Sequence, residues 1–148
     1  MTIGQRGIDL IKKYEGCKLT SYLCPAKVWT IGWGNTQYEN GLSVKKGDTI
    51  TQAEADRLFL SLVNGRFASG VQALLGRQLT QNQFDALVSF AYNCGLRALQ
   101  SSTLLRKVKK DPLDPTIAAE FAKWNKAGSK VLKGLLNRRK AEADLYFS

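Results

Sequence analysis

The sequence predicts an α+β fold, in which one helix and a small antiparallel sheet precede a predominantly helical lobe. Three observations predict it. Apolar side chains recur at helical spacing over residues 3–15. A run with β-branched and aromatic residues and a hairpin signal lies within residues 17–42. Beyond residue 50, threonine, serine and aspartate residues repeatedly precede segments of helical periodicity.

The chain of 148 residues has the length and composition of one globular domain. We expect a single domain over 1–148, with a small sheet-bearing lobe over about 1–50 and a helical lobe over about 51–148. The net charge is +10, of which 12 basic and 5 acidic residues over 86–148 supply +7. Such a charge predicts attraction to a polyanion, namely nucleic acid, an anionic membrane or an acidic cell wall.

The first predicted element is a helix over about 3–15, in which Ile8 and Ile11 share one face. Gly16 predicts its end, so Glu15 is its last residue. The end of a helix carries partial negative charge, which favours the protonated form of a carboxyl group placed there. Glu15 is therefore a candidate proton donor, and the alternative is a solvated side chain among nearby lysines.

The segment that follows predicts a small twisted antiparallel sheet. Val28–Ile31 combines β-branched and aromatic residues, as strands prefer. Gly32 and Gly34 within this run indicate a bend or a close backbone approach. Asn40-Gly41 is a strong hairpin signal.

Capping patterns predict the later helices. Thr51 and Thr80 each open a capping box. The predicted helices run from Thr80 to Gly95, from Ser101 or Ser102 to about Lys110, from Asp114-Pro115 towards Gly128, and over about 135–147.

The chain contains no histidine, which excludes a Ser-His-Asp triad, a Cys-His pair and His-ligated zinc. The cysteines Cys17, Cys24 and Cys94 lack metal-site spacing, so we expect no metal and reduced thiols. The N-terminus has no apolar segment of the signal-peptide kind, and no run of about 18 apolar residues predicts a membrane span.

Without histidine, acid–base chemistry near neutral pH falls to carboxyl groups, cysteine, tyrosine or lysine. Several acidic residues lie on predicted helices among polar neighbours, and we expect solvated faces or ion pairs for them. They are Asp56, Asp85, Glu120, Glu142 and Asp144.

Four motifs resemble those of one family. The spacing of Glu15, Cys24 and Thr30, Glu-x8-Cys-x5-Thr, resembles the active-site signature of tailed-phage endolysins, the phage-type lysozymes of glycoside hydrolase family 24. The segment 29–36 is similar to that family's Thr-Ile-Gly-x-Gly-His-Thr region. Further similar segments follow in the family's order at 79–95, 102–105 and 124–142.

The resemblance implies a lysozyme-like fold and an endolysin muramidase, which hydrolyses the β-1,4 bond between N-acetylmuramic acid and N-acetylglucosamine in peptidoglycan without a cofactor. It implies a groove between the sheet and the helical lobe. By the same resemblance Glu15 is the general acid, Cys24 is the catalytic partner, and Thr30 positions the attacking water or the carbohydrate.

Two positions depart from the common pattern of the family. Cys24 stands where many members have aspartate, and it can act as a thiolate base, as a nucleophile, or by shaping the water site. Asn35 stands where the family usually has histidine, so we expect altered local packing there rather than lost catalysis.

The resemblance also implies substrate-binding residues. Thr36, Tyr92 and Thr103 match positions that line the groove of the family. Arg138 matches an arginine that pairs with the catalytic glutamate, and its alternative is a place on a solvated basic face. Apart from the resemblance, the aromatic residues Tyr22, Trp29 and Trp33 either stack on sugar rings or pack in the core.

The resemblance indicates which polyanion the positively charged segment of the chain binds. Lys123–Lys140 contains seven basic residues and no acid, which fits attraction to the acidic cell wall. We expect a monomer that binds peptidoglycan glycan strands, with no nucleic acid partner and no stable membrane insertion. It is expected to stay in the host cytoplasm until a holin opens the inner membrane, and then to reach the periplasm and cell wall for host lysis and phage release.

Two other functions fit the sequence. A lytic transglycosylase would need only Glu15 and would leave 1,6-anhydro ends on the glycan. A non-enzymatic cationic protein would bind the wall or an anionic membrane through its charge.

Overall fold

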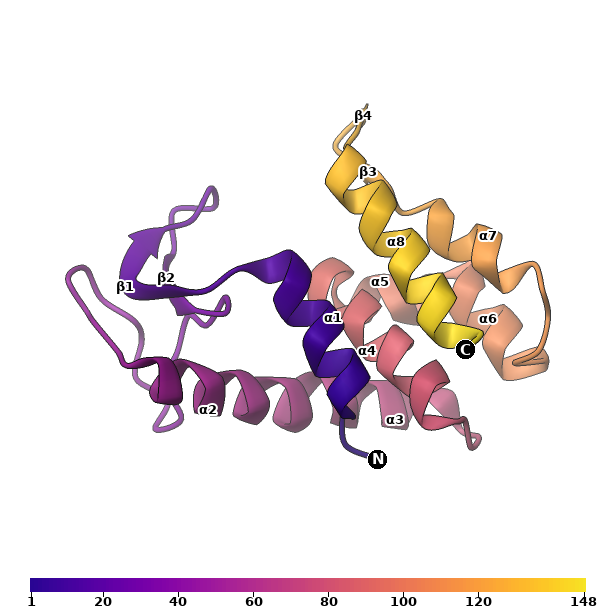
Figure 1. Cartoon of the computed structure of the whole chain (residues 1–148), viewed down its shortest axis with the longest axis horizontal. Helices are drawn as coiled ribbons and strands as arrows, with labels where there is room; N and C mark the ends of the chain where they lie inside the picture. The colour runs from indigo at the N-terminus through magenta and orange to yellow at the C-terminus, as the bar shows by residue number, and fades with distance from the viewer. The chain divides into compact units, whose positions relative to one another are not determined.

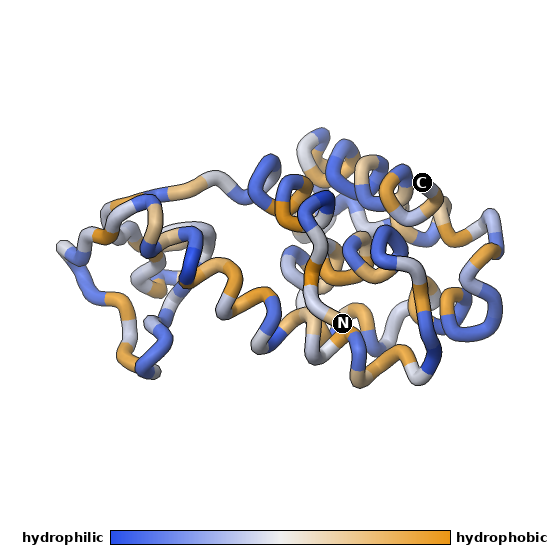
Figure 2. Tube along the Cα trace, turned by 60° about the horizontal axis from the view of Figure 1, so that its bottom comes forward, coloured by the Kyte–Doolittle hydropathy of each residue, from blue (hydrophilic) through white to orange (hydrophobic).

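The computed structural model describes residues 1–148 as two compact units, Glu15–Arg66 and the combined segments Met1–Tyr14 and Phe67–Ser148 (Figure 1). We call them the sheet unit and the helical unit. The predicted α+β fold is confirmed, because helices dominate and the strands form two antiparallel pairs. The helices alternate hydrophobic and hydrophilic residues along the chain, as amphipathic helices do (Figure 2).

The sheet unit is built on β1 (Lys18–Leu23), β2 (Trp29–Gly32) and α2 (Gln52–Leu62). The two strands pair antiparallel, with Tyr22 opposite Thr30. Strand β2 packs against α2. The core of this unit consists of buried apolar side chains, Ile31, Val44, Ala55, Leu58, Phe59 and Val63.

Two turns shape the sheet unit. In the turn from β1 to β2, the Lys27 N–H donates to the Cys24 carbonyl at 2.7 Å, and the Cys24 N–H donates to the Val28 carbonyl at 3.0 Å. Lys27 has a φ of +61°, so this is a three-residue hairpin loop that ends in a left-handed residue. The predicted turn at Asn40-Gly41 is also confirmed, and Gly41 supplies its φ of +83°.

The helical unit is organised around α4 (Gln81–Cys94), in which every residue from Gln83 to Ala91 is buried. Helices α8 (Lys133–Tyr146), α5 (Leu96–Ser101) and α3 (Ser69–Leu75) pack on it. The remaining elements of the unit are α1 (Gln5–Glu15, through Tyr14), α6 (Thr103–Lys110), α7 (Ile117–Ala122), β3 (Lys126–Ala127) and β4 (Lys130–Val131).

The predicted capping residues are confirmed. Thr51 and Thr80 each accept a hydrogen bond from the third helical N–H and complete a capping box. Ser102, rather than Ser101, caps α6, because its hydroxyl accepts from the Leu105 N–H at 3.0 Å. Gly95 follows the last residue of α4.

The prediction for residues 114–128 is wrong in part. Helix α7 begins at Ile117, because the Asp114 carboxylate turns the chain by accepting from the Thr116 N–H at 2.8 Å before the helix starts. The helix ends at Ala122, and the β3–β4 hairpin turns at Gly128, which has a φ of +63°.

A long helix formed by α2, the π-helical turn η1 (Val63–Ala68) and α3 was not predicted as one element. By length and composition alone, Gln52–Leu75 is apolar enough to cross a membrane, contrary to the expectation from the sequence. It also carries buried core side chains, among them Phe59 and Val71, as the core helix of a soluble protein does.

The N-terminal end of α1 is hydrogen-bonded to the carboxylate of Asp85 on α4. Asp85 accepts from the Gly4 N–H at 2.9 Å and the Gly7 N–H at 3.2 Å, and Gln81 donates to it at 2.7 Å. Asp85 is 1% exposed, so the prediction of a solvated or ion-paired side chain is wrong. The carboxylate satisfies helix-start donors that α1 cannot satisfy itself.

Candidate active site

Glu15 is the last residue of α1, as predicted, and its side chain is half-buried. Gly16 follows with a φ of +68°, the left-handed conformation that ends a helix at low cost for glycine. The chain then enters β1 at Lys18. The sequence thus places Glu15 at the point where helix gives way to sheet.

Three of the candidate side chains belong to the β1–β2 hairpin. Tyr22 lies directly opposite Thr30 on the paired strands, so the two side chains are cross-strand neighbours. Cys24 follows Tyr22 by two residues and begins the turn just beyond the end of β1. The Thr30 hydroxyl donates to the Val28 carbonyl at 3.0 Å, and Thr30 is buried.

The β1–β2 turn lowers the pKa of the Cys24 thiol. The backbone of Val28 lowers it most, and the backbone of Ala26 and the hydroxyl of Thr30 lower it further, against the opposing effect of burial. The left-handed Lys27 shapes the turn that carries these backbone groups. The arrangement favours the thiolate, which is the reactive form of cysteine.

Tyr22 connects the hairpin to Glu15. Burial raises the pKa of the Tyr22 phenol, and the negative charges of Cys24 and then Glu15 raise it further. Because such effects fall off with distance, the three groups lie within electrostatic reach of one another. Thr30 and Cys24 thus lie at the β1–β2 hairpin, and Glu15 ends the helix that precedes it. The structure adds Tyr22, opposite Thr30, which the sequence analysis treated as an aromatic that stacks on a sugar ring or packs in the core.

The remaining predicted residue of the sheet unit is Thr36. Its side chain is exposed, and its carbonyl accepts from the Val44 N–H at 3.0 Å. The adjacent Asn35 is 4% exposed, and its side-chain amide donates to the Leu58 carbonyl at 3.3 Å while its own oxygen has no partner. Asn35 also lines a pocket of about 470 Å³.

The other three predicted residues belong to the helical unit. Tyr92 packs its ring against Phe67, with 5.0 Å between ring centres. Thr103 borders a pocket of about 410 Å³, which Trp124 also lines. Arg138 is 3% exposed, so its alternative reading as part of a solvated basic face is wrong.

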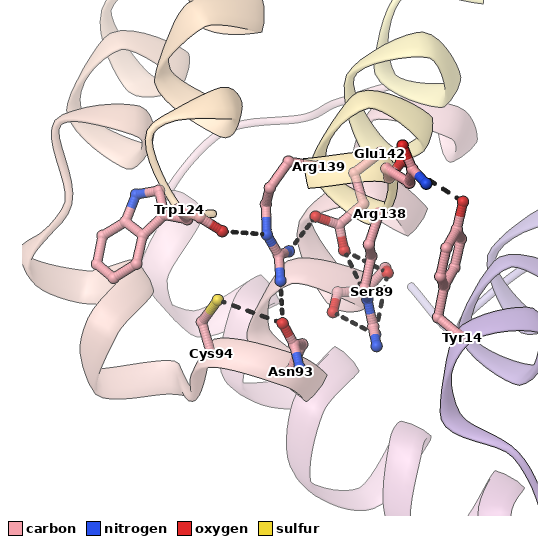
Figure 3. Close-up of polar contacts among 9 residues, drawn as sticks. Tyr14, Ser89, Asn93, Cys94, Trp124, Arg138, Arg139 and Glu142 are labelled. Carbon is pink, nitrogen blue, oxygen red and sulfur yellow. Dashed lines mark hydrogen bonds and ion pairs between the residues drawn. The ribbon is translucent and has the colours of Figure 1, made fainter. Parts of the chain in front are cut away.

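Arg138 belongs to a buried polar cluster between α4 and α8 (Figure 3). The Glu142 carboxylate accepts from the Ser89 hydroxyl at 2.6 Å and from Arg138 at 3.3 Å, and it also pairs with Arg139. Arg139 further donates to Asn93 and to the Trp124 carbonyl. The ion-pair reading of Glu142 is confirmed, whereas the solvated reading is wrong because both arginines and the glutamate are buried.

The chain shows no group of three or more His, Cys, Asp or Glu side chains that could hold a metal ion. All three cysteines are free thiols. The chemistry available at the site is therefore that of one carboxyl group, one thiol, and the hydroxyls of Thr30 and Tyr22.

Comparison with known proteins identifies close relatives. The family described as phage lysozyme matches residues 12–142. The endolysin of Bacillus phage B103 is 43% identical over 100% of this chain and 55% of its own length. The endolysin of Acyrthosiphon pisum secondary endosymbiont phage 1 is 40% identical over 100% of this chain and 99% of its own length.

Structural similarity agrees with these matches. The muramidase domain of SpmX from Asticaccaulis excentricus has a TM-score of 0.86 and 31% identity, over 99% of this chain and 98% of that structure. The chain spans about half the length of the first curated relatives that it matches, at 55% and 56%.

Proposed function

Since the chain belongs to the phage lysozyme family, we propose that it is a muramidase that cleaves the β-1,4 bond between N-acetylmuramic acid and N-acetylglucosamine in peptidoglycan. The observation that supports the proposal is the position of Glu15 at the end of α1 directly before the β1–β2 hairpin, which carries Cys24 and Thr30. One carboxylic acid and a second acid–base or nucleophilic group are the parts that glycoside hydrolysis requires.

In the proposed reaction Glu15 donates its proton to the glycosidic oxygen as the bond from that oxygen to the anomeric carbon breaks. A water molecule attacks the same carbon and gives its proton to the Cys24 thiolate. Glu15 ends as a carboxylate and Cys24 as a thiol, so a proton exchange with solvent restores both. Thr30 supports Cys24 because its hydroxyl lowers the pKa of the thiol, and it holds the turn through its bond to the Val28 carbonyl.

Substrate binding is proposed for Thr36, Tyr92, Thr103 and Arg138. Thr36 offers an exposed hydroxyl in the sheet unit, and Thr103 borders a pocket with Trp124, whose ring suits a sugar face. The buried contacts of Arg138 with Ser89 and Glu142 fix the orientation of its guanidinium. Each of these roles rests on the family pattern together with the local contacts.

The exposed lysines of the helical unit support attraction to the wall. Of the seven basic residues over 123–140, Arg138 and Arg139 are buried and the five lysines are exposed. Peptidoglycan and its attached polymers carry carboxylates and phosphates, which concentrate a cationic protein on their surface. We expect the protein to act as a monomer and to reach the wall after a holin opens the inner membrane.

The decisive experiment replaces the proton donor. Glu15→Gln keeps the shape of the side chain but removes the acidic proton, so the rate of wall lysis should fall at least about 100-fold. Asp9→Asn is the matched control, because Asp9 is an exposed carboxylate on the same helix. Lysis by the Glu15→Gln protein at the wild-type rate, with the fold intact, would refute the enzymatic function and leave the cationic-binder alternative.

Product analysis separates the two enzymatic alternatives and the roles of Cys24. Mass spectrometry should find hydrated reducing ends, and anhydro ends would establish a lytic transglycosylase instead. Proton NMR of the first-formed anomer, on the wild type and on Cys24→Asp and Cys24→Ser, distinguishes the thiol functions. Inversion indicates a base, whereas retention indicates a nucleophile.

A further inference from the structure

Tyr22 has no part in the reaction described so far, although it lies beside two residues that do. It is paired with Thr30 across the hairpin and precedes by two residues Cys24, which begins the turn just beyond the end of β1. Cross-strand partners lie about 5 Å apart between their Cβ atoms. The phenol is therefore held on the reacting side of the hairpin by the backbone register alone.

The hydroxyl of Tyr22 is available for a hydrogen bond. Tyr14, Tyr38 and Tyr146 donate their hydroxyls to Asn137, Asp48 and Pro112 respectively. The structure gives the Tyr22 hydroxyl no such acceptor, and the side chain is 38% exposed. A donor without an acceptor within the protein is suited to bind a molecule that enters the site.

The charges around Tyr22 keep it a donor. Burial and the negative charges of Cys24 and Glu15 raise the pKa of its phenol above the ordinary value of 10.0. The proton therefore stays on the phenol while the thiol and the carboxyl change their ionisation.

We propose that Tyr22 holds the attacking water against Cys24. The phenol donates a hydrogen bond to one lone pair of the water, the water donates to the sulfur, and its second lone pair is left for the anomeric carbon. During the attack the water proton passes to the thiolate and the Glu15 proton passes to the leaving oxygen, while Tyr22 keeps its own proton. This inference rests on the function proposed above and commits Cys24 to the role of base.

The test removes only the phenol oxygen. Tyr22→Phe should lower kcat on a defined glycan by about 10- to 100-fold, because a misplaced reactant costs about that much. KM and the melting temperature should stay near the wild-type values, because the hydroxyl donates to no acceptor within the protein. Tyr38→Phe is the matched control, since it removes a hydroxyl bonded to Asp48 in the same unit and should lower the melting temperature but not kcat.

A double-variant cycle tests whether Tyr22 acts through the water of Cys24. In a Cys24→Ser background, Tyr22→Phe should lower kcat by less than about threefold, because no thiolate remains to receive the water proton. Equal effects of Tyr22→Phe in both backgrounds would overturn the proposal. Tyr22→Leu adds a further check, since a loss of kcat in Tyr22→Leu alone would show that the ring is used and not the hydroxyl.

These outcomes are separable from a failure of the proposed function. Full activity of the Glu15→Gln protein would refute the proposed muramidase function itself. Loss of activity in Glu15→Gln with a wild-type kcat in Tyr22→Phe would overturn only the assignment of Tyr22. Retention of the anomeric configuration would also overturn it, because a water held for direct attack gives inversion.

Discussion

The three cysteines show how neighbouring groups set the reactivity of one residue type. Backbone and hydroxyl donors lower the pKa of Cys24, whereas burial raises the pKa of Cys94. Cys94 lies at the end of α4 beside the buried arginine cluster. The surroundings of Cys24 thus favour its thiolate, whereas burial of Cys94 favours its neutral thiol.

The difference predicts selective alkylation. At pH 7.5 iodoacetamide should modify Cys24 at least roughly tenfold faster than Cys94, because a larger fraction of Cys24 is thiolate. Peptide mass spectrometry over a time course measures both rates in one sample. Thr30→Val, which removes one donor to the sulfur, should slow the modification of Cys24 and leave Cys94 unchanged. Equal rates for the two cysteines would refute the donor arrangement.

At the scale of the residue, sequence spacing predicted Glu15 at its helix end, but it did not predict the surroundings of several acids. Glu142 and Asp85 are buried, and each is bound by a partner distant in sequence, namely the Ser89 hydroxyl for Glu142 and the N–H groups of Gly4 and Gly7 for Asp85. Such partners lie far along the chain or outside the local polar pattern. The orphaned oxygen of Asn35 is likewise a consequence of tertiary packing, which residue type alone does not reveal.

Among the elements, α1 depends most on contacts made by another helix. Its first turn approaches α4 so closely that a Cβ at Gly7 would lie 2.8 Å from the Cβ of Asp85 and 2.8 Å from Ile3. The absence of a side chain at Gly7 is therefore a packing requirement, not a conformational one. This contact fixes α1, at whose other end Glu15 lies.

Two glycines in helices should respond oppositely to the same change. Gly7→Ala should lower the free energy of unfolding by about 1–3 kcal/mol, because the added methyl overpacks the contact with Asp85. Gly134→Ala, where no atom lies within 4 Å of the new Cβ, should raise it by about 0.5–1 kcal/mol. Urea denaturation of both variants checks the pair, and a stabilised Gly7→Ala protein would contradict the close approach.

The β1–β2 turn supplies a second prediction for a single element. The left-handed conformation of Lys27 costs about 1–2 kcal/mol. Lys27→Gly removes this strain but adds the conformational entropy cost of glycine, so the net effect should be a stabilisation of about 0.5–1 kcal/mol. Lys27→Ala keeps the strain and should give no gain. Thermal unfolding distinguishes the two, and equal midpoints would show that the turn relaxes.

For the molecule as a whole, two features determine how stability depends on pH. The chain has no histidine, and several of its carboxylates have partners that lower their pKa. The hydroxyl of Tyr38 lowers the pKa of Asp48 from its ordinary 3.8, and Lys123 lowers the pKa of Glu120 from 4.5. A carboxylate whose pKa is lowered in the folded state contributes its full stabilisation at pH values above its ordinary, unfolded pKa. This contribution is lost as the pH falls through the lower pKa of the folded state.

We therefore expect the melting temperature to stay level between about pH 5.5 and 7.5, where imidazole would titrate, and to fall below about pH 4. Differential scanning calorimetry across this range measures the profile. In Asp48→Asn the acid-induced loss should be smaller, because one of the titrating groups is gone. A sharp loss of stability confined to pH 6–7 would contradict this account.

The charge of the molecule predicts the effect of salt. Raising the ionic strength from about 0.05 to 0.2 M should lower activity on whole walls more than activity on a short neutral oligosaccharide, because the screening length shrinks. A variant with Lys126, Lys130 and Lys133 replaced by glutamine should lose most of this difference. Equal salt dependence on both substrates would exclude electrostatic steering.

The order and type of most elements followed from local patterns, since capping boxes, the Asn40-Gly41 turn and the stop at Gly16 are encoded by neighbouring residues. The β3–β4 hairpin and the π-helical turn were not predicted, because neither has a strong local signal. Tyr22 entered the candidate site only once strand register was known. Register depends on pairing across the hairpin, which spacing along one strand does not determine.

The Asp85 contact also has a consequence for synthesis. Helix α1 is translated before α4, and the carboxylate that binds its opening N–H groups lies 81 residues after Gly4 and 78 after Gly7. Isolated helices as short as its 11 residues are marginal in water. During translation, α1 therefore stays incompletely ordered until α4 has been made, and the helix that ends in Glu15 is completed late.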